Sequence, residues 1–193
     1  MDIFIEKYER ECLIKCLGFQ LYSLFNAELD STQANGLKVG SASKWDDLLN
    51  GKTYTNKAGE DVQWLGIRRK ALPTDTSPSV SFLANYVFYH YEQNSDVFRS
   101  GVGYVDPRAK NAVERSPSQR VIFAWREMTE VIQGLENRPE VIVRNFGVGV
   151  DYYNYNEEVT LYRFINDINA LTPDTYPNFK PGYWNVHKNQ FGI

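Results

Sequence analysis

The chain has 193 residues, of which 42% are hydrophobic, enough to build the core of one domain of ordinary size. Charged residues make up 23% and the formal net charge is −3, which excludes a global positive field that would hold nucleic acid or an anionic membrane by charge alone. Aromatic residues reach 15%, more than a small core needs. Such an excess is typical of surfaces that bind partners, and a tyrosine-rich core would also explain it.

Nothing in the sequence indicates secretion or membrane insertion. Met1 to Ile5 begin with an acid and lead directly into charges, unlike a secretory signal, and no apolar run approaches the roughly 20 residues that cross a bilayer. We therefore expect a protein that is made in the cytoplasm and makes no membrane contact. Cys12 and Cys16 lie four residues apart in a predicted helix, which favours two reduced, buried thiols over a disulfide.

The first third of the chain predicts two helices separated by a loop. Apolar residues between Ile5 and Leu29 recur at spacings of three and four, typical of an amphipathic helix, and Gly18 in its middle predicts a bend or a close helix contact. Residues 30–40 are polar and rich in turn formers, so we expect a loop. Residues 43–51 predict a short helix that Ser43 caps and Asn-Gly ends.

A β-hairpin is predicted over about residues 52–65. Two β-prone triplets, 53–55 and 62–64, flank a segment of turn-forming residues. A short helical stretch should follow from Leu65 to Leu72, where Pro73 would stop it.

Three more helices are expected in the rest of the chain. Ser-Pro pairs precede two of them, at 80–91 and at 121–135, and proline suits the first turn of a helix. The last, about 157–169, should bury Leu161, Ile165 and Ile168.

Two glycine-bearing segments, about 97–105 and 141–150, are interpreted as extended β arms. The predicted fold class is therefore mainly α, a helical bundle of four to five helices with a small β-hairpin and extended β arms. We place the bundle in residues 1–170 and an extended C-terminal arm in residues 171–193.

No catalytic motif is present. His90 and His187 are the two histidines, and the first falls among tyrosines in a predicted helix, where a core or surface role is commoner than catalysis. Cysteines, histidines and carboxylates do not cluster at metal-ligand spacings. We therefore expect a protein that is not an enzyme and that needs no metal or cofactor.

One short basic cluster stands out, although a solvated helix end is the commoner explanation for such a run. Arg68, Arg69 and Lys70 would neutralise a few phosphates if they faced a DNA channel.

Several short motifs follow one another over about residues 4–135. In chain order they are Phe4-Ile5-Glu6-Lys7-Tyr8-Glu9, the run from Leu13 to Tyr22, Trp45 to Gly51 with Thr53-Tyr54-Thr55, Trp64-Leu65-Gly66-Ile67, Tyr86 to Tyr91, Gly101 to Val105, and Trp125. Each motif is weak alone, but their order resembles a family of head-to-tail connector proteins from tailed phages of Bacteroidetes hosts, of the crAss-like type.

This resemblance implies a structural virion protein that assembles in the host cytoplasm and resides in the neck or tail. Such a subunit forms a homo-oligomeric ring of about twelve copies, docks on the portal protein, supports the next tail ring protein and lines the DNA exit channel. The chain differs from shorter members of the family by an insertion at 72–79 and a longer end after Pro139.

The aromatic tail is the expected contact with partners. Tyr183, Trp184, Phe191 and Ile193 would enter pockets on the portal or on a neighbouring copy, unless the tail packs on its own domain. The first interpretation predicts that deleting residues 181–193 leaves a folded protein that no longer binds the portal.

Two other functions remain open. A tail-completion or terminator ring would differ from an adaptor in its stoichiometry. A DNA-packaging accessory protein would bind DNA non-specifically, with strong salt dependence.

Overall fold

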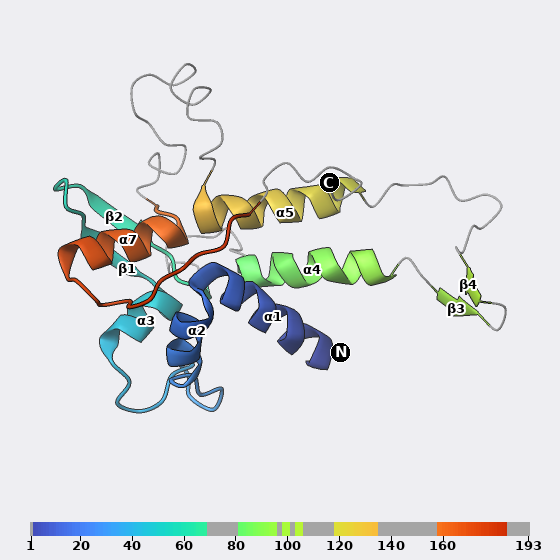
Figure 1. The fold of residues 1–193 in the computed structure, drawn as a ribbon, viewed down its shortest axis with the longest axis horizontal. Coiled ribbons are helices and arrows are strands. Elements are labelled where there is room, and N and C mark those ends of the chain that lie inside the picture. Colours follow the sequence, from blue (N-terminus) through green and yellow to red (C-terminus); the bar gives the residue numbers. More distant parts are fainter. Residues whose placement is uncertain are drawn as a thin grey trace, which may run out of the picture.

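The computed structural model describes residues 2–68, 81–95, 98–100, 103–105, 118–134 and 158–184. They form a mainly helical fold with a two-stranded antiparallel hairpin, which confirms the predicted fold class (Figure 1). The described ranges contain six helices instead of four to five, because the first predicted helix is divided in two. The predicted arm at 141–150 and the insertion at 72–79 lie outside the described residues.

Gly18 divides the predicted first helix into α1 (Asp2–Leu17) and α2 (Phe19–Asn26). Its φ of 82° is a left-handed conformation that glycine adopts without steric cost. A Cβ at this position would lie 3.0 Å from the carbonyl oxygen of Lys180. The glycine therefore marks a bend, as predicted, and a close contact with the C-terminal segment instead of with another helix.

The short helix α3 (Ser43–Asn50) forms where the sequence predicts it, but its cap differs. Ala42 occupies the N-cap position and no side chain caps the helix, so the predicted cap by Ser43 is wrong. Ser43 is already the first helical residue, one position too late to cap. Gly51 ends the helix with a φ of 98°, and a Cβ there would lie 2.6 Å from the carbonyl oxygen of Trp64.

The predicted hairpin is confirmed. Strands β1 (Lys52–Thr55) and β2 (Asp61–Trp64) are antiparallel, with Lys52 opposite Trp64. The Asn56 side chain accepts hydrogen bonds from the backbone N–H groups of Ala58 and Glu60, which fixes the turn between the strands.

The helix predicted from Leu65 to Leu72 is wrong in its described part, where residues 66–68 form a turn. Gly66 has a φ of 85°, and the backbone N–H groups of Ile67 and Arg68 donate to the carbonyls of Leu48 and Leu49 in α3. These bonds satisfy the last carbonyls of α3, so the segment packs against that helix instead of starting its own.

Helices α4 (Phe82–Ser95) and α5 (Ser118–Gln133) confirm, in their described parts, the two helices that were predicted after Ser-Pro pairs. They lie side by side, and α1 packs on α4 (Figure 1). Aromatic rings join the two helices: the centroids of Tyr89 and Trp125 are 4.6 Å apart.

The segment predicted as an extended arm at 97–105 contains a second small hairpin. Its strands β3 (Phe98–Ser100) and β4 (Gly103–Val105) are antiparallel, with Ser100 opposite Gly103. Figure 1 shows this hairpin beyond the end of α4, away from the other helices.

The last predicted helix is α7 (Leu161–Leu171), which begins after the Thr160 side chain accepts a hydrogen bond from the Arg163 N–H. Leu161 and Ile165 are fully buried, as predicted, while Ile168 is only partly buried.

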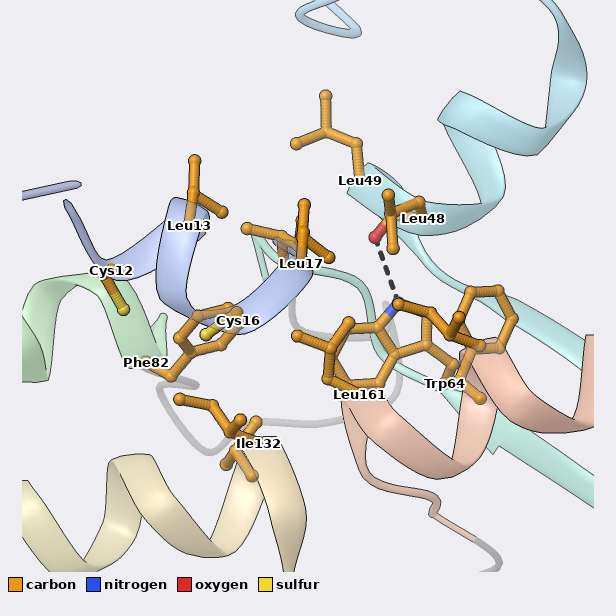
Figure 2. Close-up of a cluster of buried hydrophobic side chains, with 14 of the residues drawn as sticks. Cys12, Leu13, Cys16, Leu17, Leu48, Leu49, Trp64, Phe82, Ile132 and Leu161 are labelled. Atoms are coloured by element: carbon orange, nitrogen blue, oxygen red, sulfur yellow. Dashed lines mark hydrogen bonds between the residues drawn. The ribbon is translucent and has the colours of Figure 1, made fainter. Parts of the chain in front are cut away.

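One core joins these helices and the first hairpin. Figure 2 shows Cys12, Cys16 and Leu17 of α1 gathered with Phe82, Ile132 and Leu161 of three other helices. Both cysteines are free and 0% exposed, which confirms that they are reduced core residues.

Candidate interaction surface

Residues 180–184, here called the strap, run along the end of α1 and bind it through the backbone. The Gly182 N–H donates to the carbonyl of Lys15 at 2.7 Å, and the Lys180 N–H donates to the carbonyl of Leu17 at 3.3 Å. Because α1 ends at Gly18, these carbonyls have no partner further along the helix. The strap supplies the donors that a longer helix would have supplied. In Figure 1 it passes in dark red between α1 and α7 towards α5.

Two side chains from other helices hold the end of the strap. The Gln133 amide of α5 donates to the carbonyl of Trp184 at 2.7 Å and accepts from its N–H at 3.0 Å. The Tyr162 hydroxyl of α7 donates to the carbonyl of Gly182 at 2.6 Å and accepts from the Trp184 indole N–H at 3.0 Å. Burial raises the pKa of Tyr162, so its hydroxyl remains a donor.

The Trp184 indole is 0% exposed and is surrounded by rings. Its centroid lies 5.6 Å from that of Tyr86 and 5.7 Å from that of Trp125, and the Lys15 ammonium sits 4.0 Å above its ring. Lys15, Tyr86, Trp125, Gln133 and Tyr162 are called the Trp184 site from here on. The strap and this site tie α1, α4, α5 and α7 together.

These contacts correct one expectation about the aromatic tail. Within a single chain Trp184 is not free to enter a partner, because its own domain surrounds it and satisfies its three polar backbone and indole groups. Tyr183 next to it is 67% exposed, so much of its side chain lies on the surface. Phe191 and Ile193, the other two predicted contacts, lie outside the described residues.

A positively charged hollow of about 400 Å³ lies against α1. Its described lining residues recur at spacings of three and four, which places them on one side of the helix: Lys7, Arg10, Glu11, Ile14 and Lys15. Glu11 accepts a hydrogen bond from the Tyr86 hydroxyl at 2.7 Å, and the three basic lining residues, Lys7, Arg10 and Lys15, outnumber its single negative charge. The hollow therefore suits an acidic or phosphate group.

Arg68, the described member of the basic cluster predicted from the sequence, is not among the described lining residues of this hollow. Arg68 is exposed and its guanidinium donates to the carbonyl of Ala34 at 3.4 Å, while Arg69 and Lys70 lie outside the described residues. Sequence reasoning missed Lys7 and Arg10, because acids are interleaved with them in α1. Helical spacing is the signal that would have placed Lys7, Arg10 and Lys15 on one side of the helix, together with Glu11.

Exposed aromatic rings border the strap. Phe19, which follows the Gly18 contact with Lys180, is 64% exposed, and Tyr183 in the strap itself is 67% exposed. Large exposed rings are common in binding surfaces, where they add contact area at a small cost in conformational entropy.

Two of the side chains that were considered for chemistry pack within the fold, where His90 is partly buried and Cys12 is fully buried. His90 stacks on Tyr8 with 4.2 Å between centroids and meets Tyr86 at 4.5 Å, so it lies among tyrosines, as predicted. Burial raises the pKa of Cys12 well above its ordinary value, which keeps the thiol protonated and unreactive.

The described part of the chain holds no group of three His, Cys, Asp or Glu side chains that would bind a metal ion. No helix among the described residues combines the length and apolar character that crossing a membrane requires. Comparison of the chain with protein-family models, with curated protein sequences and with solved structures gave no match.

Proposed function

We propose that the chain is a structural virion protein, a ring-forming adaptor subunit that docks on the portal and joins it to the tail. One observation carries the proposal. Motif residues far apart in sequence, whose order resembles the connector family, are buried together in one core: Leu17, Leu21, Trp45, Trp64, Ile67, Tyr86 and Trp125. Residues that pack closely in one core must keep their size and their order along the chain if the fold is to form. A shared core therefore explains why motifs that are weak individually would occur in the same order.

The surface around the strap supports a binding role in place of catalysis. It combines exposed rings, Phe19 and Tyr183, with the positively charged hollow on α1. A ring subunit needs such surfaces because each copy contacts two neighbours and the proteins above and below.

The test is the mass and symmetry of particles formed when the purified protein is mixed with its portal. We expect about twelve copies per portal ring and no enzymatic turnover. A complex with sixfold stoichiometry would indicate a terminator ring, and no association with the portal would contradict both assignments. A monomer in isolation is compatible with the proposal, because the portal can template the ring.

The tail experiment changes because of the structure. Deleting residues 181–193 would remove Trp184 from the core, so loss of portal binding would report unfolding. A variant that ends at Trp184 keeps the strap and removes Phe191 and Ile193. We expect this variant to fold and to lose affinity for the portal, and full affinity would exclude the residues after 184 from docking.

A DNA-packaging accessory protein is the second candidate, and the hollow lined by Lys7, Arg10 and Lys15 favours it. This function predicts DNA binding that weakens steeply between 50 and 200 mM salt, by roughly a hundredfold for a few phosphate contacts. Salt-dependent DNA binding without any portal binding would favour this candidate over the adaptor.

A further inference from the structure

The Trp184 site recognises groups that every copy of this chain presents. Of its contacts with residues 182–184, three use backbone N–H or C=O groups and one uses the indole N–H. The side chains that make these four hydrogen bonds, Gln133 and Tyr162, belong to α5 and α7. Helix α1 adds two acceptors, the backbone carbonyls of Lys15 and Leu17. Since none of these contacts depends on the strap being joined to the same chain, the strap of a second copy would fit the site equally well.

If the strap of one copy entered the site of another, the chain would leave its own domain in the short segment between α7 and the strap. Tyr176 before it is 1% exposed and fixed, because its N–H and carbonyl bind the Asn169 side chain. Asn178 has a φ of 59°, a left-handed conformation that costs asparagine less free energy than most residues but more than it costs glycine. An extended path through Asn178 would relieve this cost, and strained hinges of this kind favour the exchange of terminal arms between copies.

The reach of the segment is sufficient for a neighbour in direct contact. Residues 177–184 in an extended conformation span roughly 25 Å. Exchange therefore requires a neighbour whose Trp184 site lies within about 25 Å of the point where the chain leaves its own domain.

We propose that in the assembled protein the strap of one copy occupies the Trp184 site of the adjacent copy. The inference deepens the proposed function, on which it rests, because it names the contact between neighbours in the ring. An isolated copy places its own strap in its own site, and assembly exchanges equivalent contacts. Exchange between copies would therefore remove the cost of the left-handed conformation at Asn178 and would keep every hydrogen bond of the strap.

Disulfide trapping between two single variants tests the exchange directly. A Cβ at Gly182 would lie 2.9 Å from the Cγ of Lys15, so cysteines at these two positions are within bonding range. Lys15→Cys and Gly182→Cys proteins are unfolded in urea, mixed at high concentration, refolded together and oxidised with oxidised glutathione. Because the two new thiols are on different chains, a disulfide between them in excess of random collision requires exchange, and we expect a disulfide-linked heterodimer.

Two controls make each outcome decisive. The double variant Lys15→Cys/Gly182→Cys should form a disulfide, within one chain when dilute and between chains when concentrated. A mixture of Gly182→Cys with Lys57→Cys, whose new thiol is in the exposed hairpin turn, should give no heterodimer. If the double variant closes only within one chain and the mixed single variants give no more heterodimer than the Lys57 control, exchange is excluded. A double variant that forms no disulfide at all would exclude the strap contact itself.

A second pair of variants guards against poor folding of the cysteine proteins. Trp184→Ala lacks the side chain that fills the site, and Gln133→Ala lacks the amide that holds it. When the two are refolded together, the Trp184→Ala protein offers an intact site and the Gln133→Ala protein offers an intact strap. Native mass spectrometry should then show a one-to-one heterodimer. A mixture without exchange would show none. Portal binding is measured separately, so a failure of exchange in a protein that still forms portal-bound rings leaves the proposed function standing.

Discussion

The two halves of α1 differ in what they contact. In the second half Cys12, Cys16 and Leu17 are 0% exposed, and the carbonyls of Lys15 and Leu17 bind the strap. The first half meets α4 through rings such as Tyr8 and His90. Lys7 and Arg10 are exposed and line the hollow, which continues along the helix to Lys15. The comparison separates two roles within one helix: substitutions of the buried residues and of the strap contacts should change stability, and substitutions of the exposed residues Lys7 and Arg10 should change binding.

The largest expected effect comes from removing the strap's indole. Trp184→Ala should lower the free energy of unfolding by about 3–5 kcal/mol, because it empties a fully buried site and leaves the Tyr162 hydroxyl without its donor. Urea denaturation followed by circular dichroism measures the change. The matched control is Tyr183→Ala, one residue earlier and 67% exposed, which should change stability by no more than about 0.5 kcal/mol. Equal effects of the two variants would remove the distinction between strap and surface.

A smaller loss is expected from Gly182→Ala. The added methyl group would lie 2.9 Å from the Cγ of Lys15 and 3.1 Å from its carbonyl oxygen, so the strap must shift away from α1. Overpacking of this kind costs about 1–3 kcal/mol, measured by the same denaturation experiment. In a Lys15→Ala background the Cγ contact disappears, and part of the loss should be recovered. Full additivity of the two substitutions would contradict the packing explanation.

A small dependence of stability on pH is expected from Glu9, in the first half of α1. Partial burial, and secondly the charge of Glu6, raise the pKa of Glu9 above the ordinary value of 4.5. A raised pKa means that the folded state binds the proton more tightly than the unfolded state. The stabilising contribution is therefore complete below the ordinary pKa and is lost as the pH rises through the raised value.

Glu9→Gln should accordingly stabilise the protein slightly at neutral pH, and its advantage should vanish in acid. Thermal melts across this pH range measure the difference. Asp30 gives the contrast in sign, because hydrogen bonds from Thr32 lower its pKa. Asp30→Asn should destabilise at neutral pH, and this loss should fade as the pH falls. An advantage of Glu9→Gln that grows in acid would refute the assignment.

The smallest effect on stability is expected at the hollow. Lys7→Ala with Arg10→Ala should change the free energy of unfolding by no more than about 0.5 kcal/mol, since both residues lie on the exposed side of α1. The same variant should weaken binding to an acidic or phosphate-bearing partner, measured by titration at low salt. Lys57→Ala with Lys38→Ala removes the same charge from exposed loops and is the control. A large loss of stability in the Lys7→Ala/Arg10→Ala variant would contradict the assignment of these two residues to binding.

The sequence was sufficient to predict most of the helices and the first hairpin, because their information is local, but not the division between α1 and α2 or the β3–β4 hairpin. Periodicity identified the helices that became α1, α4, α5 and α7, and turn residues identified the hairpin. The helix predicted at 65–72 failed for a tertiary reason: the described residues Ile67 and Arg68 donate to carbonyls of α3, and no local pattern indicates that partner.

The strap could not be predicted, since its partners are distant in sequence. A proline, a glycine and two aromatic residues in a row are equally compatible with a free arm and with a buried one. One weak signal existed in Gln133, a polar residue on the apolar side of α5, next to the buried Ile132. A buried amide must find a donor and an acceptor, and here both belong to the backbone of Trp184.

The contact between Gly182 and Lys15 also has a consequence for synthesis. The end of α1 is among the first parts of this sequence to leave the ribosome, and the strap that completes it is made long afterwards. Until residues near 184 are translated, the last carbonyls of α1 must bind water and the site between α1, α5 and α7 lacks its indole. The domain therefore reaches its final fold only after translation has passed the strap, and a ribosome stalled before that point would carry a nascent chain with an exposed aromatic cavity.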